Sequence, residues 1–513
     1  MPDKTLQWLA ALTVLVSFCA GLGLAPLFDK DEGAFAEATR EMVVSGDYLM
    51  TYLNGAPRYD KPILIYWLQA LCVHLFGLSE FSVRLPSGIA AVVWAWLLWR
   101  FVRERDGTRT AAWAVFILAT AIQVTLIAKA AIADALLNAC IAGTMFGFWK
   151  YHETASKKAL YGAFTAMALG ALTKGPIALY VPFATLLVFG WRRGCFRASA
   201  KTLFHPGGWA LFLAITLPWP ILAYLDQGWP LIQAWIFDQT IRRVGGPLEG
   251  HGGNIFYYLP VILLGLMPWT PLFLKQLRRI RPACENELNQ YLWIWLLSVF
   301  ILFSLMGTKL PHYMIYGYTP VCILMARLLS EQQSVRPMLL AGAVLCVLFL
   351  TVPLLIPVAV PMSKSEFAVR LIDESMALFD WRYSLPFAGG LLIFAALLAL
   401  PRLRSDYKAI ALGWVFLALV NFHIMPFAGK ITQEPIREAA LLAKRENLPV
   451  VKWKLNMPSF YFYRESLIEE RLAAPGEIIF TRIDELESIY EQYDVLYYDK
   501  GVVLAKVLKV RGL

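Results

Sequence analysis

Repeated apolar runs of about 20 residues, the length needed to cross a bilayer, constrain the fold of this chain most. They lie near 6–27, 81–101, 110–128, 132–149, 159–173, 176–191, 209–225, 255–274, 290–307, 312–328, 337–360, 385–401 and 408–427. Backbone polar groups find no water partner inside a bilayer, so each run must be helical. About thirteen spans are therefore predicted. The chain is 58% hydrophobic and only 16% charged, with mean hydropathy +0.55.

Basic residues occur in every second loop between these runs. They include Arg103, Arg105 and Arg109, then Lys150, Lys157 and Lys158, Arg192, Arg193 and Arg197, Lys275, Arg278 and Arg279, Arg327 and Arg336, and Arg402, Arg404 and Lys408. The positive-inside rule assigns such loops and the N-terminus to the cytoplasm. The loops 28–80, 226–254 and 361–384 then face the other side, as does the chain after about 427. The same rule accounts for the net charge of +10, so no nucleic-acid partner is expected.

The composition changes near Thr432, where the last apolar run has ended. Helices are predicted over 435–447 and 483–492, with short strands over 450–455, 477–480 and 495–498. The predicted organisation is a polytopic all-α membrane domain, 1–430, followed by a small α/β domain, 431–513, on the outer side. No internal repeat is visible, which disfavours an inverted-repeat transporter.

The loop 28–80 contains two predicted helices that lie at the membrane interface. Residues 31–45 place Ala34, Ala38 and Met42 on one side at helical spacing, and Gly46 suits the C-terminal end. Residues 62–78 are apolar, but counting them as a span would reverse the basic loops. The second segment is therefore predicted to lie along the membrane surface.

Asp31 and Glu32 begin the first of these helices. A carboxylate that faces water at a helix start can accept a proton or orient a nucleophile, and the helix N-terminus stabilises its charge. The alternative is a simple helix cap, because Asp is a favoured N-cap residue.

The segment Arg58-Tyr59-Asp60-Lys61 precedes the second helix. Arg and Lys side chains at this place are good partners for a phosphate. The alternative is interfacial anchoring, for which Tyr, Lys and Arg are also typical.

Asp134 and Lys174 lie at the predicted outer ends of two spans. An acid at membrane depth is costly and indicates function; the alternative is a structural pair with Lys129. Gly175 and Pro176 follow Lys174 and predict a turn. A tight hairpin with a snorkelling Lys174 is therefore the alternative to a functional cation.

Further candidates lie in two other outer segments. The glycine-rich loop 238–254 contains Arg242 and His251 and could move as a lid. His251 is a weak candidate metal ligand, together with Asp60; a solvated loop is the alternative. Lys309 and Tyr313 begin another span, where an interfacial belt is the alternative.

All these candidate groups fall on the same predicted side of the membrane. A transporter would place its polar groups near the bilayer midplane. A cluster at one face, beside interfacial helices, favours chemistry on lipid-anchored substrates.

The chain resembles bacterial GT-C glycosyltransferases of the aminoarabinose (lipid A) transferase and protein O-mannosyltransferase superfamily. The resemblance rests mainly on the pattern DE-x3-AE-x2-REM-x2-SGD, from Asp31 to Asp47, and on RYDKPILIYW after it. The segments AIADALL, TKGP, GHGGNIFYYLP, KLPHYMIYGYTP and MPSFYFYRES follow in family order.

The resemblance implies a fold of thirteen helices with a periplasmic C-terminal domain. It implies an inner-membrane enzyme that takes a sugar from undecaprenyl phosphate, with inversion, and passes it to lipid A or another envelope acceptor. The alternatives are a protein O-glycosyltransferase of this fold and a flippase for lipid-linked sugars. No cofactor is expected to be required, although a divalent metal at His251 and Asp60 is a possibility that the family pattern includes.

The resemblance also implies roles for individual residues. Asp31 and Asp134 correspond to the catalytic acids, and Lys61 to the lysine that holds the carrier phosphate. Arg242 and Tyr313 correspond to further phosphate or donor contacts. The sequence departs from aminoarabinose transferases at Ala34 and Phe35, where Arg and Tyr are usual, and RYDKP replaces RYFEKP. These departures leave the sugar, the acceptor and the metal open.

Overall fold

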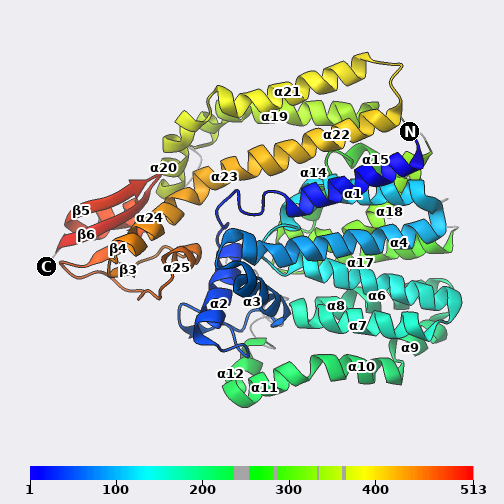
Figure 1. Ribbon diagram of the computed structural model, residues 1–513, viewed down its shortest axis with the longest axis horizontal. Helices are drawn as coiled ribbons and strands as arrows, with labels where there is room; N and C mark the ends of the chain where they lie inside the picture. Colours follow the sequence, from blue (N-terminus) through cyan, green and yellow to red (C-terminus); the bar gives the residue numbers. More distant parts are fainter. Residues whose placement is uncertain (236–252, 281–285, 332–333, 361–364, 512–513) are drawn as a thin grey trace.

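The computed structural model describes residues 1–235, 253–280, 286–331, 334–360 and 365–511. Long helices lie side by side along most of the molecule, and a small β-sheet lies beyond one end of them (Figure 1). The helix α2 and the helix α3 lie at this same end, between the long helices and the chain's C-terminal part.

The helices of the first half follow one another with short connections. They are α1 (Asp3–Cys19), α2 (Asp31–Ser45), α3 (Leu64–Phe76), α4 (Glu80–Thr120), α5 (Ile122–Ile127), α6 (Asp134–Thr154), α7 (Lys157–Lys174), α8 (Ile177–Arg192), α9 (Phe196–Leu203), α10 (Pro206–Thr216), α11 (Pro218–Gln227) and α12 (Trp229–Ile232). Within α4, Gly107 has a φ of 82°, so the runs 81–101 and 110–128 belong to separate helical arms.

The second half continues the helical bundle and ends in the α/β part. Its helices are α14 (Tyr258–Gly265), α15 (Thr270–Arg278), α17 (Glu287–Leu305), η2 (Pro311–Gly317), α18 (Tyr318–Ser330), α19 (Arg336–Ala359), α20 (Glu366–Ser375), η4 (Met376–Leu378), α21 (Trp381–Ala399), α22 (Ser405–Leu419), η5 (Val420–Ile424), α23 (Met425–Thr432), α24 (Glu434–Arg445), α25 (Ser459–Arg464) and α26 (Ile483–Ile489). The strands are β1 (Tyr52–Leu53) and β2 (Ala56–Pro57) in the first loop, then β3 (Val450–Lys452), β4 (Ile478–Arg482), β5 (Tyr490–Asp499) and β6 (Val502–Val510).

Five helical stretches in the described part are long and apolar enough to cross a membrane. They are α4, α17, most of α19, α21 and the continuous stretch Ser405–Thr432. Two bent pairs raise the number to seven if each pair counts as one span. The chain is thus a helical, multi-pass membrane protein, as predicted, while the count of thirteen spans stays a prediction.

The run 255–274 is not the single straight span that the sequence predicted. It forms α14 and α15, which are bent by 120° at the break between them. Pro268 lies in this break, and a proline inside a helix removes a hydrogen bond and clashes with the preceding turn. Gly265 permits the close approach there, because an added Cβ would lie 2.2 Å from the Tyr318 hydroxyl.

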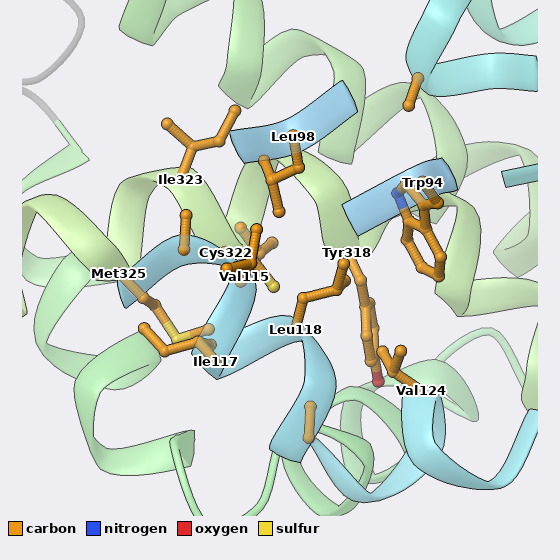
Figure 2. Packing of buried hydrophobic residues seen from close by; sticks show 14 of the residues in the cluster. Trp94, Leu98, Val115, Ile117, Leu118, Val124, Tyr318, Cys322, Ile323 and Met325 are labelled. Atoms are coloured by element: carbon orange, nitrogen blue, oxygen red, sulfur yellow. The ribbon is translucent and has the colours of Figure 1, made fainter. Parts of the chain in front are cut away.

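The core between the two arms of α4 and the helix α18 is densely packed (Figure 2). Two pairs of polar side chains are hydrogen-bonded inside it. The Trp94 indole N–H donates to the Thr319 hydroxyl at 2.8 Å, and the Tyr318 hydroxyl donates to the Gln123 side-chain oxygen at 2.5 Å. Such pairing offsets the cost of burying polar groups and fixes the helices relative to one another.

The basic loops gather at one end of the helical part. The Met1 amino group and Arg109 both pair with Asp406, at 2.9 and 2.5 Å, which joins three distant segments of the chain. Lys150 pairs with Glu104 at 3.1 Å at the same end. We call this region the basic end. The loops that the sequence grouped by charge therefore also group in space.

The helix predicted over 31–45 has these bounds in the structure, and Gly46 ends it with a φ of 72°. The expectation of one buried face is wrong, since every residue from Glu32 to Met42 is buried. The helix is enclosed because α3 covers it on one side and α25 on another. Glu37 and Glu41 do not face water: Arg40 pairs with Glu37 at 2.7 Å, and Glu41 accepts two backbone N–H bonds.

The predicted interfacial segment 62–78 forms the helix α3, as expected. Tyr66 and Gln69 are fully buried, whereas Trp67, Leu71 and Leu75 are exposed along one stripe. An exposed apolar stripe beside long apolar helices suits contact with a lipid surface.

The C-terminal part contains a four-stranded sheet in the order β3-β4-β6-β5. The helix predicted over 435–447 is α24, and the three predicted strands correspond to β3, β4 and part of β5. The strand β6 was missed, and the helix predicted to 492 ends at Ile489 because β5 begins at Tyr490. The strand β6 pairs with both β4 and β5, so it lies at the centre of the sheet.

The C-terminal part packs against the first loop. The Ser459 N–H donates to Asp29 Oδ1 at 3.0 Å, and the Leu27 N–H donates to the Tyr463 hydroxyl at 2.8 Å. Asn54 exchanges two hydrogen bonds with the backbone of Ile468. The loop that holds Asp31 is therefore fixed from both sides, by the helices and by the C-terminal part.

Candidate active site

Asp134 is the centre of a buried polar cluster at the end of the bundle opposite the basic end. It is the first residue of α6 and is 2% exposed. Lys174 Nζ donates to both carboxylate oxygens at 2.8 and 2.9 Å, and the Tyr316 hydroxyl donates to Oδ1 at 2.5 Å. His312 Nε2 lies 4.0 Å away. The structural pair suggested with Lys129 is wrong, because Lys174, at the end of α7, reaches Asp134 instead.

A cavity of about 530 Å³ adjoins this cluster. Asp60 and Lys61 line it from the first loop, Lys174 from α7, and Tyr313 and Tyr316 from η2. The remaining wall is largely apolar and includes Ile177, Tyr180, Trp219, Trp235, Leu302, Phe303 and Met306. Asp60, Lys61 and Lys174 are its charged residues, and we call it the donor cavity after the lipid donor that we propose for it.

Arg58 is held beside the donor cavity rather than pointing freely into water. Its guanidinium donates to the Tyr66 hydroxyl at 2.5 Å, pairs with Asp60 at 3.2 Å and lies over the Phe35 ring at 5.0 Å. Tyr59 donates to the Gln227 side-chain oxygen at 2.7 Å. These contacts fix the segment that carries Lys61.

Asp31 lines a second cavity, of about 280 Å³. It is exposed and is the first residue of α2, following Lys30 at the N-cap. The suggestion that it serves only as a helix cap is therefore wrong. Lys129 and His312 line the same cavity, which we call the acceptor cavity. Successive residues of η2, His312 and Tyr313, thus line one cavity each.

His312 connects the groups of the two cavities. It is near enough to interact electrostatically with Asp134, Lys174 and Lys61, and also with Asp31 of the other cavity. Its ring also meets the Tyr313 ring edge to face, with centroids 4.9 Å apart. The predicted acids and bases from four distant segments therefore lie in one region of the molecule.

Glu32 has a different environment from its neighbour Asp31. It is 4% exposed and forms a two-pronged pair with Arg84, at 2.9 and 2.8 Å. It also accepts the backbone N–H groups of Phe28 and Ala131. Burial alone would raise the pKa of the Glu32 carboxyl, but Arg84 and these bonds hold it below its usual value. Glu32 thus joins the first loop to α4 and to the segment before α6.

The Lys309 side chain is buried, and its ammonium group lies at the C-terminal end of α17. Its ammonium group donates to the backbone carbonyls of Ser304 and Met306 at 2.8 Å each, with Phe303 at 3.4 Å. These carbonyls lack partners within α17, so Lys309 caps this helix.

Two predicted residues, Arg242 and His251, lie outside the described residues. Within the described ranges, no group of three or more His, Cys, Asp or Glu side chains could hold a metal ion. Asp60, the other predicted ligand, pairs with Arg58.

Sequence reasoning missed Tyr316, His312 and Tyr66 as members of the site. The signal for the first two was present, because His312, Tyr313 and Tyr316 fall within one five-residue stretch. Tyr66 lies eight residues after Arg58, and only the tertiary fold brings the two side chains together.

The sequence is similar to known membrane transferases. Residues 60–221 match the family model described as dolichyl-phosphate-mannose-protein mannosyltransferase. An undecaprenyl phosphate-alpha-4-amino-4-deoxy-L-arabinose arabinosyl transferase of Edwardsiella ictaluri is 32% identical over 310 residues, which cover 58% of this chain and 55% of the relative. The enzyme of that name from Shewanella sediminis is 30% identical over 328 residues, covering 62% and 58%. The matches thus span little more than half the length of these relatives.

The fold is similar to that of a solved structure over nearly the whole chain. The crystal structure of ArnT from Cupriavidus metallidurans bound to undecaprenyl phosphate superposes with a TM-score of 0.83 at 19% identity, covering 97% of both chains. At this identity the likeness establishes the fold. Together, these comparisons show a chain that is similar in sequence to aminoarabinose transferases and to a mannosyltransferase family model over part of its length, and that shares the fold of ArnT over nearly all of it.

Proposed function

We propose that the protein is an inverting membrane glycosyltransferase that transfers a sugar from undecaprenyl phosphate to lipid A or another acceptor of the bacterial envelope. The observation that carries this proposal is a pair of cavities that neighbouring residues of η2 line, Tyr313 in one and His312 in the other. One is lined by Lys61 and Lys174 and is otherwise largely apolar, and the other contains Asp31. The names of the relatives agree with such a donor.

The donor lipid would place its phosphate at Lys61 in the donor cavity. The apolar wall would take the first part of the prenyl chain, and the exposed stripe of α3 would lie in the adjoining lipid. Lys61 would stabilise the charge that develops on the phosphate as the sugar leaves. Arg242 would add a second cation, and Tyr313 a hydroxyl donor.

Asp31 would act on the acceptor from the other cavity. The acceptor oxygen forms the new bond to the anomeric carbon while the bond from that carbon to the phosphate oxygen breaks. The bonding electrons leave with polyprenyl phosphate. If the acceptor is a hydroxyl, its proton passes to Asp31 as general base. If the acceptor is a phosphate, Asp31 orients it, and no proton transfer is needed.

Asp134 would fix the positions of the residues that line the two cavities relative to one another. Its bonds to Lys174 and Tyr316 fix the end of α7 to η2, which holds Tyr313 and His312. This is a positioning role, whereas the resemblance implies that Asp134 is one of the catalytic acids.

The active site would face the periplasm, with the basic end in the cytoplasm. Positive-inside reasoning supports this orientation, because the basic loops share one end of the bundle. The N-terminus would be cytoplasmic, the protein would cross the inner membrane thirteen times, and residues 431–513 would form a periplasmic domain.

The test is sugar transfer in liposomes from a set of undecaprenyl-phosphate sugars to extracted envelope lipids. We expect product from the wild type and from Lys430→Ala, whose lysine is exposed on α23, and little from Lys61→Ala. Product on secreted protein alone would favour the protein O-glycosyltransferase. No product with any acceptor, together with donor movement across the bilayer, would favour the flippase and contradict the proposal.

A further inference from the structure

A groove runs along the bundle from the basic end toward the active-site end, where Leu136 lies two residues after Asp134. Its volume is about 450 Å³, and it is lined by α4, α6 and α7. Val93 and Leu97 of α4, Leu136 and Gly143 of α6, and Leu169 of α7 form part of its apolar wall. The proposed transfer reaction uses none of these residues.

The character of the groove changes along its length. On α4, Val93 and Leu97 are followed on the same face by Arg100 and Glu104. On α6, Leu136 and Gly143 are followed on the same face by Lys150. All charged residues of the lining thus lie at one end, and the rest of the wall is apolar. A helix rises about 1.5 Å per residue, so the stretch from Leu136 to Lys150 is roughly 20 Å long.

The charged end of the groove carries an excess of cations. Lys150 and Arg100 pair with Glu104 at 3.1 and 3.4 Å, and Arg105 pairs with Glu153. Three cations therefore face two carboxylates, which leaves one positive charge. The Arg100 and Lys150 side chains are 57% and 41% exposed, so both can reach a ligand.

We infer that this groove binds one anionic phospholipid. An acyl chain would lie along the apolar wall. The groove is long enough for this, because the hydrocarbon region of one bilayer leaflet is roughly 15 Å thick. The singly charged phosphodiester would lie at Arg100 and Lys150 and neutralise the excess charge. Basic pockets between membrane helices are a known way to hold anionic head groups.

Gly162 of α7 offers a way to fill the groove without disturbing the fold. It lines the groove, and a Cβ added there would meet no described atom within 4 Å. Leucine is also a better helix former than glycine. Gly389 of α21 is a matched control, because an added Cβ meets no described atom there either and the groove does not include it.

The experiment is native mass spectrometry of the full chain released from phosphatidylglycerol or phosphatidylcholine nanodiscs. We expect the wild type and Gly389→Leu to retain one phosphatidylglycerol through delipidation, and Gly162→Leu to lose at least tenfold of that occupancy. Equal retention of phosphatidylcholine would overturn the inference, as would full phosphatidylglycerol retention by folded Gly162→Leu.

A second pair of variants tests the head-group contact and remains informative if Gly162→Leu does not fold. The double variant Arg100→Gln/Lys150→Gln should lose the preference for phosphatidylglycerol over phosphatidylcholine. Arg402→Gln, which removes an exposed charge near the N-terminus of α22, should keep it. An unchanged preference in the double variant would also overturn the inference.

Discussion

The two ends of the helical bundle hold many charges but use them differently. At the active-site end, Asp134 pairs with Lys174, and these two side chains are only 3% and 11% exposed. At the basic end, Arg193 pairs with Glu287, and these two side chains are 38% and 42% exposed. Water screens the second pair, whereas the first is enclosed and bonded to Tyr316 as well. The enclosed pair can hold groups of the site in place, whereas the exposed pair adds little to stability; the pair of the Met1 amino group with Asp406 is the enclosed exception at the basic end.

The largest effect should come from breaking the enclosed pair. Lys174→Met leaves the Asp134 carboxylate buried without its cation, which typically costs about 3–5 kcal/mol. The free energy of unfolding, measured by thermal or SDS titration in detergent, should fall by this amount. Arg193→Met at the basic end should change it by less than about 1 kcal/mol. Equal costs for the two variants would remove the distinction between the ends.

Lys61→Ala tests the donor cavity directly. We expect kcat/KM to fall about 10²–10³-fold, because removing one preorganised donor to a developing charge has this effect. The measurement is initial-rate transfer at varied donor concentration. Lys430→Ala should match the wild type, and a Lys61→Ala enzyme with unchanged kcat/KM would refute the assignment of the phosphate to this cavity.

Lys309 shows that a buried cation at the active-site end can also be structural. Lys309→Met should lower the free energy of unfolding by about 1.5–3 kcal/mol, since the carbonyls at the end of α17 lose a charged donor. Lys430→Met, in which an exposed lysine is lost, should have little effect on the same unfolding curve. A cost below about 0.5 kcal/mol would mean that water replaces the cap.

Asp29 gives a pH signature. Burial raises the pKa of its carboxyl from 3.8 to about 7, against the lowering effect of the Ser459 bonds. As pH rises, the unfolded chain loses the Asp29 proton at a lower pH than the folded chain does. The contribution of Asp29 to the free energy of unfolding therefore falls between about pH 4 and pH 7.

Asp29→Asn retains a side-chain oxygen for Ser459 and removes the titration. The unfolding midpoint of this variant should therefore fall less between pH 4 and 7 than that of the wild type. Asp373→Asn, at an exposed site on α20, should keep the wild-type slope. Parallel curves for the wild type and Asp29→Asn would show that Asp29 does not titrate in this range.

Local sequence signals predicted local structure well. The bounds of α2 follow from an acid at the N-terminal end and Gly46 in the left-handed region at the other end. Residue chemistry also selected Asp31, Lys61, Asp134 and Lys174, which the fold brings to one region.

Long-range partners could not be predicted in this way. Lys129 is near Asp134 in sequence, but the actual partner is Lys174, forty residues away. Asp31 and Glu32 are adjacent carboxylates, yet Glu32 is buried in a pair with Arg84, whereas Asp31 is exposed. The strand β6 was missed because its place depends on pairing with β4 and β5.

The most direct test of the account is donor binding beside transfer in Asp31→Asn, an isosteric change at an exposed residue. If Asp31 serves the acceptor, this variant should bind undecaprenyl-phosphate sugar as the wild type does while transfer falls about 10²–10⁴-fold. Asp373→Asn should be unchanged in both measurements. Wild-type transfer by Asp31→Asn would contradict the account, because the acceptor cavity would then contain no group that the reaction needs.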